Sequence, residues 1–202
     1  MTPYEWTSVA VKAALAPRDL LLEARGPDRK FTAVSTDSRT IAPGELFVAL
    51  RGDYFDGHEF VRAACAAGAA GVLVDRNAPA ELTEGLDAAV FVVTDSLVAY
   101  GALARARRDQ IDVPVVVITG SSGKTTTKEL LRSAIDAHTR VHATQANFNN
   151  RIGLPRTLLA TPVEVDAVVL EAGTSEPGEI AELAAISDPD VAVVTTVGEA
   201  HL

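Results

Sequence analysis

The segment from residue 115 to residue 127 has the residue types and spacing of a phosphate-binding loop. It reads Val-Val-Val-Ile-Thr-Gly-Ser-Ser-Gly-Lys-Thr-Thr-Thr. The apolar start predicts a buried strand. The glycine-bearing turn can direct backbone N–H groups at phosphate oxygens, and the helical pattern that follows adds the positive end of its dipole. In this arrangement Lys124 reaches the β- and γ-phosphates and the Thr125 hydroxyl lies on Mg²⁺. The segment therefore predicts a site for a nucleoside triphosphate.

The loop departs from the usual P-loop pattern at one position. That pattern has a glycine at position 118, but residue 118 is Ile and still belongs to the strand. Turns rich in glycine and serine are also common without a ligand, but Lys-Thr-Thr directly after the second glycine favours the nucleotide. The predicted nucleotide contacts of this shorter loop are Gly120, Ser121, Ser122, Gly123, Lys124, Thr125 and Thr126.

A second candidate is the carboxylate that ends the apolar run from Asp166 to Glu171. Beside a phosphate loop, Glu171 suits a Mg²⁺ ligand, directly or through water, because a hard cation prefers oxygen donors. The alternative is a solvated or helix-capping glutamate. We favour the metal ligand because the phosphate loop is present.

Three asparagines and two histidines are further candidates. Asn147, Asn149 and Asn150 offer donors and acceptors in one loop, although Asn150 can equally cap a helix. His201 follows the last predicted strand, and a lone histidine of this kind is usually structural or solvated. In the first half of the chain, Arg39, Arg51 and His58 could bind a diphosphate, with Ser38 bonding a base or sugar; solvated loops are the alternative.

The composition is that of a folded protein with an acidic surface. The chain has 202 residues, of which 48% are hydrophobic, and a formal net charge of −9. This charge disfavours a general nucleic-acid or anionic-membrane binder, since no basic stripe is present. The single cysteine, Cys65, cannot form an internal disulfide. The start of the chain lacks the pattern of a signal peptide and no apolar run approaches a membrane span, so we expect a cytoplasmic protein, without membrane insertion, that acts as a monomer.

The sequence pattern changes near residue 110, where the segment 109–114 resembles a linker. We predict a first domain over residues 1–110, with helices at 4–16, 59–67 and 97–108 and strands at 31–36, 46–50, 71–75 and 89–94. We predict a second domain over residues 111–202, with strands at 115–119, 167–170 and 191–197, a possible strand near Val141, and helices at 124–137, 152–160 and 178–186.

The predicted fold class is α/β, with a small mixed α/β amino-terminal domain followed by a partial parallel-sheet domain that has helices on both faces. Ligands of parallel sheets bind at the carboxyl ends of the strands. Gly120, Glu171 and His201 all follow predicted strands directly. We therefore expect the three positions to meet at one edge of the sheet.

Several segments, in order along nearly the whole chain, resemble the Mur ligase family. The loop from Gly120 to Thr126 is similar to the family's short P-loop. The resemblance extends to residues 36–39 (Thr-Asp-Ser-Arg), 43–49, 55–60, 147–155 (Asn-Phe-Asn-Asn-Arg-Ile-Gly-Leu-Pro) and 171–180 (Glu-Ala-Gly-Thr-Ser-Glu-Pro-Gly-Glu-Ile). The last two are most similar to the family members that join D-alanyl-D-alanine to UDP-N-acetylmuramoyl-tripeptide in peptidoglycan precursor synthesis.

The resemblance implies an ATP-dependent amide ligation through an acyl phosphate. It implies that Lys124 neutralises the transferring phosphoryl group, that Thr125 and Glu171 hold one Mg²⁺, and that His201 serves a second metal. Asn149 and Asn150 are expected beside ATP or the acyl phosphate. The UDP end is expected at Ser38, Arg39, Arg51, Asp56, Gly57 and His58.

The resemblance also implies a missing part. The sequence stops at His201-Leu202, inside the family's His-Leu-Glu motif, before the lysine and the carboxy-terminal domain that the family uses. We therefore expect an amino-terminal fragment that does not ligate by itself.

Three other functions remain open from the sequence. The first is a ligase that adds a diamino acid, which the Asn-Phe-Asn-Asn segment disfavours. The second is a non-catalytic module that binds a nucleotide or a UDP-sugar. The third is an unrelated P-loop phosphotransferase, which leaves the first domain unexplained.

Overall fold

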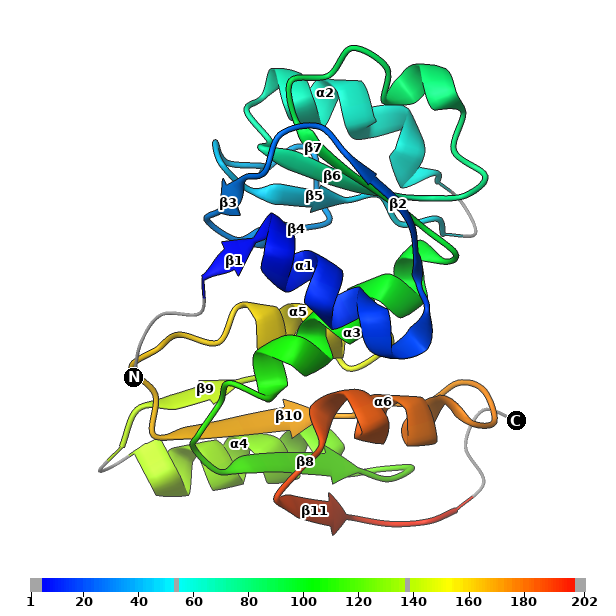
Figure 1. Cartoon of the computed structure of the whole chain (residues 1–202). Coiled ribbons are helices and arrows are strands. Elements are labelled where there is room, and N and C mark those ends of the chain that lie inside the picture. The colour runs from blue at the N-terminus through cyan, green and yellow to red at the C-terminus, as the bar shows by residue number, and fades with distance from the viewer. Residues whose placement is uncertain (1–4, 53–54, 137–138, 199–202) are drawn as a thin grey trace. The chain divides into compact units, whose positions relative to one another are not determined.

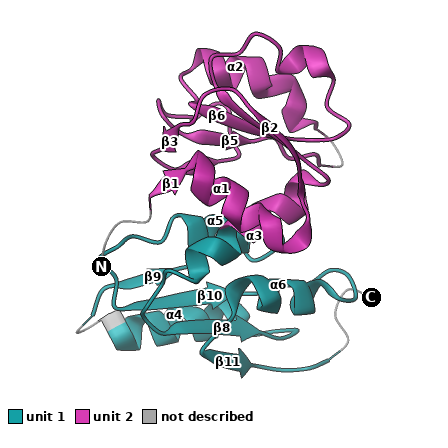
Figure 2. Cartoon of the chain, in the orientation of Figure 1, with its two compact units in different colours: residues 1–4, 104–202 teal, residues 5–103 magenta. Residues whose placement is uncertain are grey.

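The computed structural model describes residues 5–52, 55–136 and 139–198, and it contains two compact units (Figure 2). Unit 2 covers residues 5–103, and unit 1 contains the chain from residue 104 onward. Helix α3, Ser96–Arg108, carries the chain across this division. The sequence placed the domain boundary after residue 110, beyond the end of this helix. No helix in the described ranges is long and apolar enough to cross a membrane.

Unit 2 is built on a five-stranded sheet in the order β2-β7-β6-β5-β4 (Figure 1). The strands are β2 (Leu21–Arg25), β4 (Val34–Ser35), β5 (Leu46–Val48), β6 (Gly71–Asp75) and β7 (Ala89–Val93). Strand β2 runs antiparallel to β7, and the other neighbours are parallel. A separate antiparallel pair joins β1 (Trp6–Thr7) to β3 (Lys30–Phe31).

Helices α1 (Ser8–Leu15) and α2 (Val61–Ala66) belong to unit 2, together with the short 3₁₀ helices η1 (Ala16–Arg18), η2 (Gly57–Phe60) and η3 (Ala80–Leu82). Helix α1 begins at Ser8 because the Thr7 side chain accepts a hydrogen bond from the N–H of Ala10 at 3.1 Å. The core beside α2 is mostly aliphatic, in keeping with the low aromatic content of the chain. It contains Phe47, Ala49, Val61, Ala64, Ala69, Val72, Val74 and Val90.

The sequence predicted one strand over residues 31–36, and this prediction was wrong. Phe31 pairs with Trp6 in the small sheet, whereas Val34 pairs with Leu46 in the large one. The chain changes partners between these two residues, so a single strand cannot continue through them. The prediction also missed β2, whose exposed residues show no alternation of apolar and polar side chains.

Unit 1 contains a four-stranded sheet in the order β11-β8-β10-β9, and every neighbouring pair is parallel. The strands are β8 (Val115–Thr119), β9 (Val141–Ala143), β10 (Ala167–Glu171) and β11 (Val191–Val194), and the helices are α4 (Lys124–Asp136), α5 (Gly153–Leu159) and α6 (Glu179–Ser187). Parallel neighbours align their carboxyl ends. In this register Leu170 lies beside Val117 and Glu171 beside Ile118.

Helices lie against both faces of this sheet. Val168 and Leu170 of β10 join residues of α5 and α6 in one core cluster, and α4 packs on β8, β9 and β10. All five residues of β10 are buried, as expected for a central parallel strand. The predicted fold class is therefore confirmed, a mixed α/β unit followed by a P-loop parallel-sheet unit.

We expect this central strand to dominate the stability of unit 1. Replacing Leu170, which is fully buried, with alanine should lower the free energy of unfolding by about 2–5 kcal/mol, because it leaves a cavity in the sheet core. Leu130→Ala on α4 is the matched control, since that side chain is 68% exposed. Its effect should stay within about 0.5 kcal/mol in urea denaturation. Equal losses in the two variants would contradict the assignment of the core.

Candidate functional site

The phosphate loop joins the end of β8 to the start of α4. Its two glycines have φ values of +137° at Gly120 and +84° at Gly123, which side-chain-bearing residues rarely adopt. Lys124 begins α4, and its Nζ donates a hydrogen bond to the carbonyl oxygen of Gly120 at 2.7 Å. The lysine side chain therefore folds back over the loop and is held by the Gly120 carbonyl oxygen.

Glu171, at the end of β10, faces this loop. Glu171 is only 2% exposed, yet both of its carboxylate oxygens accept hydrogen bonds. Thr125 Oγ1 donates to Oε2 at 3.0 Å, and Asn149 Nδ2 donates to Oε1 at 2.8 Å. The backbone N–H of Glu171 donates to Thr144 Oγ1 at 3.0 Å. The structure thus brings together three of the residues that the sequence singled out.

The loop that carries Asn147, Asn149 and Asn150, which we call the asparagine loop, presents only one of these three side chains to Glu171. The backbone oxygen of Asn149 accepts from the N–H of Gly173 at 2.8 Å, which fixes this residue beside β10. Asn150 Oδ1 instead accepts from the N–H groups of Ile152 at 3.1 Å and Gly153 at 2.9 Å, at the start of α5. This is the capping role that was left open from the sequence. The third asparagine, Asn147, is exposed.

The donor set fits a magnesium ion bound together with phosphates. A hydroxyl and a carboxylate, on Thr125 and Glu171, share one hydrogen bond, so both can turn to one hard cation. Among the described residues no group of three or more histidine, cysteine, aspartate or glutamate side chains could hold a metal. Mg²⁺ commonly has one or two protein ligands, with water and substrate phosphates completing the octahedron. The predicted ligand His201 lies outside the described residues.

Some residues that support the site were not predicted. Thr144, which follows β9, accepts the N–H of Glu171, and its own carbonyl oxygen accepts from the buried Lys128 Nζ at 2.8 Å. The lysine also pairs with Glu129 at 3.0 Å. A position directly after a parallel strand, at the edge where ligands bind, was the available signal for Thr144.

In unit 2, His58 is buried, with 2% of its surface exposed. Its Nε2 accepts the backbone N–H of Asp75 at 3.0 Å, which assigns the ring proton to Nδ1. Nδ1 lies 2.5 Å from Asp56 Oδ1, so it donates to that carboxylate. Both ring nitrogens are engaged, and direct contact with a substrate would require these bonds to break.

Arg51 and Asp56 carry the exposed side of this cluster. An Arg51 guanidinium nitrogen lies 2.9 Å from Asp56 Oδ2 and another lies 4.0 Å from Asp75. Burial acts to raise the pKa of Asp56, but hydrogen bonds from the backbone and ring of His58 and from Arg51 outweigh it and lower the pKa. Gly57 packs so closely that a Cβ there would lie 2.5 Å from the Leu50 carbonyl oxygen. The backbone at Gly57 is therefore closely packed against Leu50.

Arg39 lies on another loop and pairs with Asp37. Its Nε and Nη2 donate to the two Asp37 carboxylate oxygens at 2.8 and 2.7 Å, which raises the pKa of Arg39. The Arg39 side chain is 85% exposed, and the neighbouring Ser38 is half-buried. Arg39 is therefore oriented and accessible to an anion.

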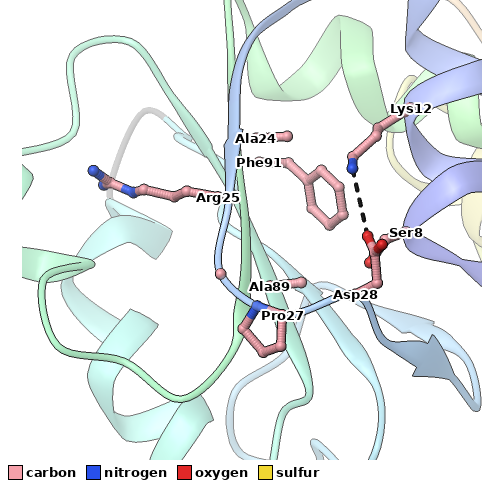
Figure 3. A pocket seen from close by; sticks show the side chains of 9 residues that line it. Ser8, Lys12, Ala24, Arg25, Pro27, Asp28, Ala89 and Phe91 are labelled. Atoms are coloured by element: carbon pink, nitrogen blue, oxygen red, sulfur yellow. Dashed lines mark hydrogen bonds and ion pairs between the residues drawn. The ribbon is translucent and has the colours of Figure 1, made fainter.

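Unit 2 also contains a small pocket (Figure 3). It lies between α1 and the β2–β3 connection, where Lys12 Nζ and Asp28 Oδ1 approach to 3.5 Å. Arg25 also lines it, but Figure 3 shows its guanidinium pointing away from Lys12. The residues that line this pocket include none of the predicted site residues.

Comparison with known proteins identifies the family. The Mur ligase middle domain matches residues 118–202, and the domain described as "Mur ligase family, catalytic domain" matches residues 30–116. The chain therefore belongs to the Mur ligase family.

Two curated relatives are named UDP-N-acetylmuramoyl-tripeptide–D-alanyl-D-alanine ligase. The Bacillus subtilis protein is 44% identical over 169 residues, which is 84% of this chain and 36% of the relative. The Escherichia coli protein is 40% identical over 180 residues, which is 89% of this chain and 38% of the relative. The chain thus spans little more than a third of the length of these relatives.

Solved structures give the same result. MurF from Acinetobacter baumannii has a TM-score of 0.85 and 34% identity, covering 98% of this chain and 42% of that chain. MurF from Thermotoga maritima in complex with ADP has a TM-score of 0.75 and 38% identity, covering 84% and 38%. A ligase for 2,6-diaminopimelate has a TM-score of 0.56 and 21% identity, covering 85% and 37%, and this likeness concerns the fold alone.

The Asp56 contacts predict how the stability of unit 2 depends on pH. Because the pKa of Asp56 is lowered in the folded state, its ionised form stabilises the fold above the ordinary value of 3.8. This contribution is lost as the pH falls through the lower, folded-state pKa. Asp56→Asn should therefore cost about 1 kcal/mol at pH 7 and progressively less below pH 3.8. Urea denaturation at a series of pH values measures this, and a cost that does not change with pH would contradict the pairing.

Proposed function

We propose that this chain supplies the substrate-binding and phosphate-binding units of an ATP-dependent ligase that joins D-alanyl-D-alanine to UDP-N-acetylmuramoyl-tripeptide. The observation that carries the proposal is the contact of the phosphate loop with a buried glutamate, through Thr125 and Glu171, in a chain 40–44% identical to ligases of that name. The 34–38% identity to solved MurF structures supports this assignment over the addition of a diamino acid.

The nucleotide end of the site is proposed to lie at the phosphate loop. Lys124 would leave the Gly120 carbonyl oxygen and neutralise the β- and γ-phosphates. The first amides of α4 have no partner within the helix and would donate to phosphate oxygens. Thr125 and Glu171 would hold Mg²⁺, which supplies positive charge beside the transferring phosphoryl group.

The chemistry that this arrangement supports is the activation of a carboxylate. The terminal carboxylate of the UDP-linked tripeptide attacks the γ-phosphorus of ATP and forms an acyl phosphate, with ADP as the leaving group. The amino group of D-alanyl-D-alanine then attacks the acyl carbon, phosphate leaves, and the amine loses a proton to give the amide. Two anions meet in the first step, so Lys124 contributes by lowering their repulsion. Asn149, which contacts Glu171, would keep that carboxylate oriented.

The uridine diphosphate is proposed to bind on unit 2. The exposed, oriented guanidinium of Arg39 and the half-exposed Arg51 are suited to phosphate oxygens, and Ser38 to a base or sugar. We assign His58 and Gly57 a positioning role, because the buried ring of His58 contacts Asp56 and Gly57 packs closely on Leu50. Use of ATP and a UDP-linked substrate supports a cytoplasmic reaction, and we propose a monomer.

Isothermal titration with UDP-N-acetylmuramoyl-tripeptide, and separately with Mg-ATP, tests the two ends independently. Arg39→Ala should weaken binding of the UDP substrate by at least about tenfold, because it removes a charge-assisted contact of about 1.5–3 kcal/mol. Lys124→Ala should weaken Mg-ATP binding by a similar factor. Each variant should leave the affinity for the other ligand unchanged.

Arg140→Ala provides the control, since this arginine is exposed and pairs with Glu164 on the surface. It should bind both ligands like the unmodified chain. Absence of binding of either ligand to the unmodified chain, or an equal loss in the control, would contradict the proposed sites.

A further inference from the structure

The segment that follows β11 lies directly against the phosphate loop. The Thr196 carbonyl oxygen accepts the N–H of Ser121 at 2.8 Å, and Thr196 Oγ1 accepts the N–H of Ser122 at 3.2 Å. Thr195 Oγ1 lies 2.6 Å from the carbonyl oxygen of Ser122, to which it donates. Ser121 and Gly198 exchange two further hydrogen bonds, at 2.8 and 3.0 Å. We call residues 195–198 the loop strap.

The strap and the loop fit together closely. A Cβ on Gly120 would lie 2.2 Å from Thr195 Oγ1 and 2.8 Å from the Thr196 carbonyl oxygen. The strap also continues the sheet, because the N–H of Thr195 donates to the carbonyl oxygen of Thr119 at 2.9 Å. Its position is therefore fixed by β11 and not by the loop alone.

These contacts divide the donors of the loop into two groups. The N–H groups of Ser121 and Ser122 already have protein acceptors on Thr196. The first N–H groups of α4 have none within the helix, by helix geometry. A phosphate would therefore bind at the start of α4, beside Lys124. Ser121 and Ser122, in the first half of the loop, would support the loop structure.

We propose that Thr195 and Thr196 are positioning residues of the phosphate loop. Their hydroxyl groups hold Ser122 in the conformation that directs the later amides and Lys124 at the phosphates. This inference rests on the proposed nucleotide binding at the same loop.

Replacement of the two hydroxyl groups tests the inference. The double variant Thr195→Val, Thr196→Val keeps the side-chain shapes but removes the contacts of both hydroxyls with Ser122. It should weaken Mg-ATP binding by about tenfold in isothermal titration, the equivalent of one or two neutral hydrogen bonds. The double serine variant, which restores the hydroxyl groups, should bind within about threefold of the unmodified chain. Thr161→Val, the same change at a helix-end hydroxyl that contacts Thr157, should bind normally.

Amide hydrogen exchange of the ligand-free chain provides a test that does not depend on nucleotide binding. The amides of Ser121 and Ser122 should be protected in the unmodified chain. Protection of the Ser122 amide, whose acceptor is the Thr196 hydroxyl, should fall about tenfold or more in the valine variant while β10 stays protected. Unchanged exchange, or unchanged or tighter Mg-ATP binding by the valine variant, would overturn the inference. The unmodified chain could show the protection and yet not bind Mg-ATP. That result would refute the proposed nucleotide site and the role of the strap in binding, but not the contacts of the strap with the loop.

Discussion

The hydrogen bond from Thr125 to the buried carboxylate of Glu171 is the contact on which the arrangement of the candidate site in the ligand-free chain depends. A carboxylate that is only 2% exposed is costly unless its oxygens have donors. Thr125 and Asn149 supply them, one from the phosphate loop and one from the asparagine loop. The Glu171 carboxylate therefore holds together three segments that are far apart in the sequence, namely the phosphate loop, the asparagine loop and the end of β10.

The parallel sheet makes this convergence possible. Glu171 lies beside Ile118 in the register, so the end of β10 meets the chain as it leaves β8 for the loop. The N–H of Glu171 is anchored by Thr144 at the end of β9, and β11 brings the strap to the other side of the loop. Each strand of the sheet contributes its carboxyl end to the site, and the helices between them fill the core that fixes the strands.

The sequence predicted those parts of the fold whose signals are local. A few neighbouring residues are enough to recognise the strand from Val115 to Thr119, the glycines of the loop and the strand that ends at Glu171. The cap of α3 also has a local signal, because Asp95 is a residue type that favours helix starts and directly precedes the helix. Its Oδ1 accepts from the N–H groups of Leu97 and Val98. Strand β2 was missed because an exposed antiparallel edge strand need not alternate apolar and polar residues.

What the sequence could not reveal are pairings between distant residues. His58 appears in a polar loop, as a substrate-binding residue would, and only the folded chain shows that Asp56 and Asp75 engage its ring. Likewise, nothing near Thr195 and Thr196 connects them to a loop more than seventy residues earlier. Asn149 and Asn150 are adjacent in the sequence, but the loop turns one to Glu171 and the other to the start of α5.

A crystal structure of the chain with Mg²⁺ and a non-hydrolysable ATP analogue tests the central claim most directly. The account predicts that the triphosphate lies at the start of α4, that Lys124 Nζ has moved from the Gly120 carbonyl oxygen to a phosphate oxygen, and that one Mg²⁺ lies between the Thr125 hydroxyl and the Glu171 carboxylate. A bound analogue that leaves the Thr125–Glu171 and Lys124–Gly120 hydrogen bonds intact, with its phosphates elsewhere, would contradict it.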